Sequence, residues 1–270
     1  MIMVLTFVFG GKYGGDAGIC FGENLNQLFL LPKNAIGDML NINLYTENVM
    51  KKLLYNTLLP LAFIAIFLWS LIGVSQSRSF YDTQYQKNGT AAYIGIAHND
   101  LMEVTDNLLS YMVEQREDLF MHYEVKGKLR EIFDYREKLH MVDVVNLYMG
   151  VIRIAAALSA VVLASLAFLI KKDGWSTARK TLNKKYLWSA IGLGVVASAF
   201  GIAIITNFDA FWRKFHYVFF TNDLWQLDPK VSIMINMFPL EFFYAMCARI
   251  LIVFVLGCIA VKFLLMEFRR

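Results

Sequence analysis

The sequence is poor in cysteine and lacks the short motifs that mark common metal and nucleophile sites. Its 270 residues include only Cys20, Cys247 and Cys258, and no cysteine lies in residues 75–147. A disulfide framework needs several spaced cysteines, so the composition argues against one. No HExxH, CxxC or GxSxG segment is present, so no compact motif supports zinc chemistry or a serine nucleophile. We therefore predict no metal ion and no cofactor.

An excess of charge of one sign is also missing. The chain has 26 lysines and arginines against 22 acidic residues, for a net charge of +4, which is too weak to predict nucleic-acid binding. Apolar residues, in contrast, make up 57% of the chain, and the mean hydropathy is +0.48. Soluble domains are usually nearer 45–50% apolar. Because the excess is concentrated in blocks, the sequence predicts an integral membrane protein.

Four of these blocks are long enough to cross a bilayer, which takes about 20 mostly apolar residues. They are residues 57–74, 151–170, 187–205 and 243–265. We predict a mainly α, polytopic membrane protein with four transmembrane helices.

The charges between the blocks predict an orientation. Loop 171–186 has a single acid, Asp173, and short cation-rich loops stay in the cytoplasm. With four spans, both termini are then cytoplasmic, and residues 75–147 and 206–242 form an extracellular cap and an extracellular segment. The cations of the loop are Lys171, Lys172, Arg179, Lys180, Lys184 and Lys185.

Residues 1–49 do not fit this plan. Their apolar start is too short to span a membrane, and they lack the basic region and cleavage site of a signal peptide. The segment Met50-Lys51-Lys52, followed by apolar sequence, is typical of a signal-anchor helix. We predict that 1–49 is an N-terminal extension from a misassigned start.

The expected cap shows local signals for two helices and a hairpin. Residues 100–115 have apolar side chains at helical spacing, and Asp100 with Glu103 has the spacing of an N-terminal cap pair. Residues 120–133 predict a hairpin that turns at residues 126–128. Asp134 with Glu137 is a second cap signal, and the helix it opens has no breaker before the second span.

The extracellular segment 206–242 combines many rings with a few polar residues. Aromatic side chains favour membrane interfaces, but this preference does not explain the polar turns among them. We interpret the cluster as the wall of a site. Its candidate residues are Phe211, Phe215, Tyr217, Phe219, Asn222, Asp223, Trp225 and Asp228.

Two of the four histidines are candidates for chemistry. His140 and His216 each lie on an outward segment beside a membrane end, and Asp143 shares a helix face with His140. Structural hydrogen bonding is the competing interpretation, and two histidines with Asp143 can also ligate a metal. His98 and His122 are expected to have no functional role.

The segments REKLHMVDVVNLY (136–148), FHYVFFTNDLWQLDP (215–229) and INMFPLEFF (235–243) resemble the lipoprotein intramolecular transacylases of low-GC Gram-positive bacteria. The likeness runs from about residue 50 to the C-terminus. It implies four transmembrane helices under an extracellular cap in the cell membrane. It also implies that His140 and His216 match the catalytic histidines of the family.

The resemblance implies a reaction within one substrate, a lipoprotein whose N-terminal cysteine carries a diacylglyceryl group. The sn-2 acyl chain passes to the cysteine α-amine and leaves a lyso-form, N-acylated lipoprotein, with membrane lipids as the surroundings. We assign His216 as general base and His140 as the group that polarises the carbonyl or protonates the glyceryl oxygen, although the roles can be exchanged. Asp143 is a candidate to orient or charge His140.

Two arginines lie in or at the edge of apolar spans, where an unpaired charge is costly. Arg153 and Arg249 are expected to meet Asp209, Glu241 or a lipid headgroup. Two alternative functions remain at this point. One is a non-enzymatic membrane module, and the other is a metal-dependent lipid hydrolase that uses His140, Asp143 and His216.

Overall fold

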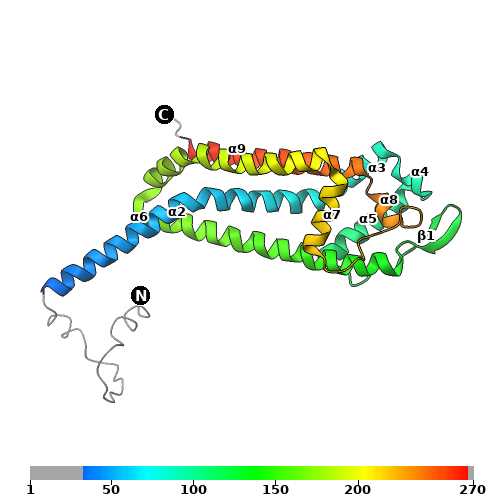
Figure 1. Cartoon of the computed structure of the whole chain (residues 1–270), viewed down its shortest axis with the longest axis horizontal. Helices are drawn as coiled ribbons and strands as arrows, with labels where there is room; N and C mark the ends of the chain where they lie inside the picture. The colour runs from blue at the N-terminus through cyan, green and yellow to red at the C-terminus, as the bar shows by residue number, and fades with distance from the viewer. Residues whose placement is uncertain (1–32, 267–270) are drawn as a thin grey trace, which may run out of the picture. The chain divides into compact units, whose positions relative to one another are not determined.

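Helices dominate the computed structural model, which describes residues 33–266, with the side chains of 41–266. A single two-stranded sheet accompanies them in this part of the chain. The elements are α2 (Lys33–Ser75), α3 (Arg78–Asn88), α4 (Thr90–Ile94), α5 (His98–Met112), β1 (His122–Val125), β2 (Lys128–Glu131), α6 (Tyr135–Thr206), α7 (Phe208–Phe219), α8 (Ile233–Met237) and α9 (Leu240–Leu265) (Figure 1).

The chain divides into two compact units, Met1–Met50 and Lys51–Arg270. The boundary falls within α2, and the other elements all belong to the second unit. Of the expected extension 1–49, residues 1–32 lie outside the part of the chain that the structure describes. The start of translation at Met50 stays a prediction.

Three helices of the described part, α2, α6 and α9, are long and apolar enough to cross a membrane. Helix α6 contains both 151–170 and 187–205, and its helical geometry is interrupted at Gly174, where φ is 76° and ψ is 153°. Glycine adopts this positive φ without the steric penalty of a Cβ atom. The mainly helical membrane fold is confirmed, whereas four separate crossings stay a prediction.

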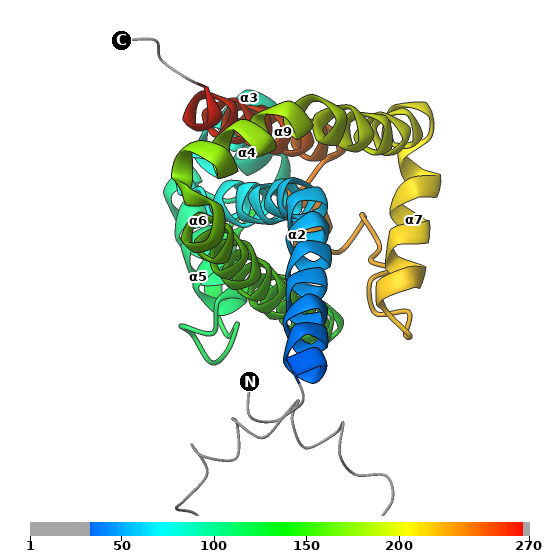
Figure 2. The ribbon, with the colours of Figure 1, turned by 90° about the vertical axis from the view of Figure 1, so that its left-hand side faces the viewer.

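Past Gly174 the second leg of α6 runs back beside α9 (Figures 1 and 2). Tyr186 donates a hydrogen bond to the Cys258 carbonyl at 2.8 Å, and Lys262 donates to Asn183 at 2.6 Å. These contacts fix the end of α9 that is remote from the cap against the start of the returning leg.

The local signals for the hairpin and for the start of α6 are confirmed. Lys126 and Gly127 have φ values of 53° and 73° between the antiparallel strands, as two-residue hairpin turns require. Asp134 and Glu137 form a reciprocal capping box, and the helix they open continues into the second expected span.

The predicted cap pair Asp100 and Glu103 is wrong. Helix α5 begins at His98 after Ala97, which gives no side-chain cap. Asp100 therefore lies inside the first turn, where the helix dipole favours an acidic side chain without a capping bond.

The cap has its own aromatic core between α3, α4, α5, α8 and the hairpin. Phe242 from the first turn of α9 lies in this core, 5.3 Å from the ring of Phe80 and stacked 6.0 Å from Tyr85. Each buried ring contributes about 1.5–3 kcal/mol through the loss of exposed apolar surface. The cap is thus anchored to α9.

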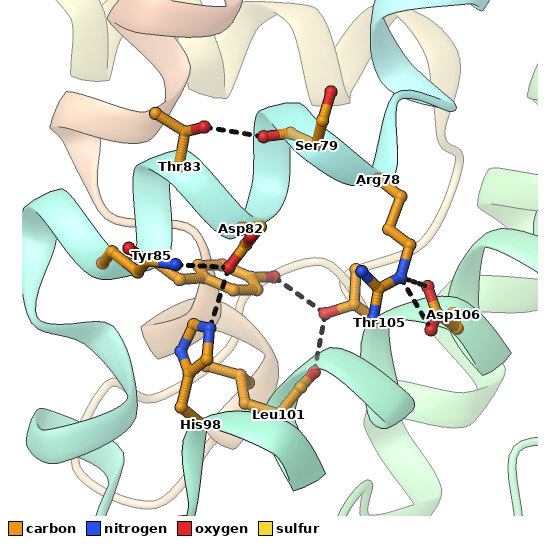
Figure 3. Close-up of polar contacts among 10 residues, drawn as sticks. Arg78, Ser79, Asp82, Thr83, Tyr85, His98, Leu101, Thr105 and Asp106 are labelled. Atoms are coloured by element: carbon orange, nitrogen blue, oxygen red, sulfur yellow. Dashed lines mark hydrogen bonds and ion pairs between the residues drawn. The ribbon is translucent and has the colours of Figure 1, made fainter.

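Polar contacts join α3 to α5 on the cap (Figure 3). Arg78 Nε lies 2.8 Å from Asp106 Oδ1, and His98 Nε2 lies 2.8 Å from Asp82 Oδ1. The half-buried His98 thus bridges two helices of the cap, and it makes no contact with the other histidines.

Candidate functional site

Two helices bring His140 and His216 together. His140 lies in the second turn of α6, and His216 lies on α7, whose first turn is capped by the Asn207 side chain accepting from the Ala210 amide at 2.9 Å. The ring centroids are 6.1 Å apart, and the two residues are only 8% and 5% exposed. A small group on a substrate can therefore contact both rings at once.

The hydrogen bond of His216 defines its tautomer. Its Nδ1 lies 2.7 Å from the Trp212 carbonyl oxygen. A carbonyl only accepts hydrogen bonds, so Nδ1 carries the proton and the neutral ring has its lone pair on Nε2. Burial lowers the pKa of His216 below 6.5, and the bond to Trp212 opposes this shift. The ring is therefore mostly neutral at pH 7, with a basic Nε2.

His140 is neutral for a related reason but lacks a fixed partner. Burial, and then repulsion by His216, lower its pKa to about 4, although Asp143 acts in the opposite direction. Its Nδ1 is buried and has no hydrogen-bond partner among the described residues. An unsatisfied buried polar atom costs about 1–3 kcal/mol, and a hydrogen bond to a substrate would remove that cost.

Rings enclose the histidine pair on several sides. Phe220 contacts both, at 5.4 Å from His140 and 5.5 Å from His216. Trp225 stacks on His216 at 4.6 Å, and Trp212 meets the same ring edge-on at 4.7 Å. This apolar enclosure is the physical cause of the lowered pKa values.

The predicted ring residues fall into three groups. Phe215 and Trp225 contact His216 directly. Phe219 contacts Phe215, and Tyr217 contacts Trp225, but both are exposed. Phe211 makes no ring contact within residues 41–266 and stays a prediction.

Two further rings at the site belong to the predicted aromatic cluster in residues 206–242 but were not named among its candidate residues. Trp212 lies four residues before His216 and shares its face of α7, whereas Phe220 lies four residues after it as the extended C-cap residue that ends α7. The signal was present in this spacing. The spacing indicates these contacts only if residues 208–219 form a helix. The many aromatic residues did not indicate a helix in this segment.

Polar side chains tie the α7–α8 connection to the first turns of α6. Asn222 donates to Asp143 at 2.8 Å. Arg136 donates to the Asp223 carbonyl and forms an ion pair of 3.3 Å with its carboxylate. In the described part Asp143 makes no hydrogen bond to His140 and accepts from Asn222 instead, although its charge raises the pKa of His140. Its expected role in orienting or charging His140 stays a prediction.

The Glu137 side chain also joins α6 to the start of α8, whereas the sequence indicated only its role in capping α6. Its carboxylate is 1% exposed and accepts hydrogen bonds from Ser232 Oγ at 2.5 Å and from the Met234 amide at 3.0 Å. It lies almost one turn before His140 on α6. The same residue therefore caps α6 and fixes the start of α8.

The remaining candidates lie away from the histidines. Asp228 accepts from the Lys230 amide at 2.9 Å in a turn. Arg249 lies over the ring of Phe80, 5.8 Å from its centroid, and Arg153 is exposed and has no ion pair within residues 41–266. Neither arginine pairs with an acid there, which leaves the lipid headgroup among the expected partners.

The described side chains form no group of three or more histidine, cysteine or acidic residues arranged to hold a metal ion. At the histidine pair the nearby acid, Asp143, is bonded to Asn222. The geometry instead suits acid–base chemistry by two neutral imidazoles in an apolar enclosure.

Comparison with known proteins shows which family the chain matches. A family model described as lipoprotein intramolecular transacylase Lit matches residues 56–243. A solved structure of the membrane integral lipoprotein intramolecular transacylase Lit from Bacillus cereus is similar, with a TM-score of 0.64 and 20% identity over 80% of this chain and 94% of that chain. A form of that protein with one histidine replaced by arginine gives a TM-score of 0.66 and 20% identity over 83% and 94%. The search of curated proteins gave no match.

Proposed function

The chain belongs to the lipoprotein intramolecular transacylase family, and we propose that His140 and His216 carry out its acyl transfer. As a member it is a membrane-integral enzyme that acts on lipoproteins, so the non-enzymatic alternative and the metal-dependent hydrolase are set aside. The observation that carries the proposal is the pair of buried, neutral rings 6.1 Å apart.

The proposed substrate is a lipoprotein whose N-terminal cysteine carries a diacylglyceryl thioether. The α-amine attacks the carbonyl carbon of the sn-2 ester, a C–N bond forms, and the bond from that carbon to the glyceryl oxygen breaks. The neutral amine loses one proton, and the glyceryl oxygen gains one. No acyl-enzyme, cofactor or second substrate is needed for this balance.

His216 is proposed as the general base. An α-amine has a pKa near 7.7–8.0 and is mostly ammonium at neutral pH, so the nucleophile is the minor neutral form, whose extra proton has gone to solvent. The nitrogen loses one more proton as it attacks the ester. The tautomer fixed by the Trp212 carbonyl leaves Nε2 of His216 as the acceptor for the amine proton. His216 then returns this proton to the departing glyceryl oxygen, which leaves the ring neutral for the next cycle.

His140 is proposed to polarise the ester carbonyl. With a pKa of about 4 it stays neutral at pH 7, so it donates an N–H hydrogen bond and adds no charge. Such a bond is worth most where negative charge develops on the carbonyl oxygen in the transition state. The buried, unpartnered Nδ1 supports this role.

The enclosure supplies the other requirements. Holding amine and ester together can lower the barrier by up to about 7–11 kcal/mol, and excluding water prevents wasteful hydrolysis of the ester. The cation-rich segment 171–186, which lies within α6 around the interruption at Gly174, supports cytoplasmic termini. On that orientation the histidine pair lies at the extracellular interface of the membrane.

An isotope label tests the intramolecular step. A diacylglyceryl lipopeptide with a labelled sn-2 chain is incubated with the enzyme and excess unlabelled phospholipid, and the product is analysed by mass spectrometry. We expect the label on the α-amine of the same molecule, with one chain moved and none gained. An unlabelled N-acyl group or a product with three chains would show transfer between molecules.

A further inference from the structure

A second polar region lies far from the histidine pair, between α2 and the start of the returning leg of α6. It is a hollow of about 590 Å³ lined by Asn56, Thr181, Lys184, Lys185, Trp188 and Ser189. From Trp188 to the end of α6 at Thr206 the helix rises roughly 27 Å at 1.5 Å per residue. This length is close to the thickness of a bilayer core, about 30 Å, so the hollow lies at the opposite membrane surface.

The lining of the hollow is cationic. Lys185 Nζ is held 2.7 Å from Asn56 Oδ1, which positions this ammonium. Lys184 is exposed and makes no hydrogen bond or ion pair within residues 41–266. No acid lines the hollow, and the acid of segment 171–186, Asp173, accepts from Lys51 at 2.9 Å and from Tyr55 at 2.8 Å.

The other lining residues match the level of lipid headgroups. Trp188 is 75% exposed in the first turn of the apolar segment 187–205, and tryptophan favours the boundary between headgroups and acyl chains. Thr181 and Ser189 add hydroxyl donors beside the two ammonium groups. Lysine ammonium and hydroxyl groups together are suited to bind phosphate oxygens.

We propose that this hollow binds the phosphate of an anionic phospholipid headgroup in the leaflet opposite the histidine pair. Basic pockets between membrane helices bind such headgroups. The acyl chains of the lipid would extend along the apolar residues that follow Trp188. This site is separate from the proposed reaction and does not depend on it.

Lipid retention measures this binding. The full chain is reconstituted in vesicles of equal parts phosphatidylglycerol and phosphatidylcholine, extracted in mild detergent, and its bound lipid is counted by native mass spectrometry. A hydrogen bond to a charged group contributes roughly a tenfold factor, so losing both ammonium contacts to the phosphate in Lys184→Gln with Lys185→Gln should weaken phosphatidylglycerol retention roughly 100-fold. Replacing both with arginine should preserve it.

The matched control removes the same charge outside the hollow. Lys52→Gln with Lys171→Gln changes two exposed lysines on the same side of the predicted bilayer and should keep the retention of the parent protein. Equal loss in both glutamine pairs, or a parent protein that retains both lipids equally, would overturn the proposal. Displacement of the lipid by excess inorganic phosphate would identify free phosphate as the ligand and also overturn it. Transfer by the Lys184 and Lys185 variants in neutral detergent should be unchanged.

Discussion

Replacing Glu137 by alanine should loosen the contact that holds the α7–α8 connection against α6. One carboxylate oxygen accepts from Ser232 Oγ at 2.5 Å and the Met234 amide at 3.0 Å, and the other accepts from the Asp134 amide at 2.6 Å. The alanine variant loses all three acceptor contacts at once, almost one turn from His140.

The size of the effect follows from where the donors lie. Asp134 is exposed, so water can replace the carboxylate at its amide. Ser232 is buried, and its hydroxyl and the Met234 amide lose a charged acceptor. Hydrogen bonds to charged groups contribute about 1.5–3 kcal/mol each, so Glu137→Ala should lower the free energy of unfolding by about 3–6 kcal/mol. Ser232→Ala, which breaks one of these bonds, should lower it by about half as much.

Unfolding of the purified protein from a mild detergent into a denaturing one, followed by tryptophan fluorescence, measures this free energy. Glu124→Ala is the matched control, because Glu124 is an exposed glutamate on β1. Its effect should stay within about 0.5 kcal/mol. If Glu137→Ala is as stable as Glu124→Ala, the reasoning from the buried carboxylate is refuted.

Three further predictions concern the site and the topology. Asn222→Ala removes the bond to Asp143 and should slow transfer about tenfold, from roughly 1.4 kcal/mol of lost positioning; an unchanged rate would contradict this. The rate should fall first through the α-amine pKa near 7.7–8.0 and more steeply through the pKa of His216, which burial lowers, so this second acid limb should lie below pH 6.5. Trp225→Ala exposes the ring and should move that limb upward in pH. If the limb stays at the same pH, it does not report the titration of His216. A cysteine introduced into segment 171–186 of α6 should react with a membrane-impermeant reagent only from the cytoplasmic side, and labelling from outside would reverse the topology.

Short-range signals predicted several elements well. The capping box of Asp134 and Glu137 and the turn at Lys126 and Gly127 each depend on residues within a few positions of one another. Apolar length similarly predicted the membrane helices, and rare sequence blocks around His140 predicted the family. These features depend on local geometry and composition, which a sequence displays directly.

Long-range contacts could not be predicted in the same way. The bond between Asp143 and Asn222 spans 79 positions, and that between Glu137 and Ser232 spans 95. Their pairing depends on how α6 and the α7–α8 connection meet in space. Arg249 illustrates the same limit, because its contact is the ring of Phe80 on α3 and not an acid nearby in the sequence.

The proposed histidine pair is tested most directly by the initial transfer rates of His140→Ala, His216→Ala and the double variant. Each protein must first show normal membrane insertion, and His122→Ala, on the exposed β1, serves as control with a nearly normal rate. Because the two imidazoles act as one unit, each single variant should lose most activity, and the double variant should be no slower than the slower single one. A folded single variant that transfers at the normal rate would contradict the account.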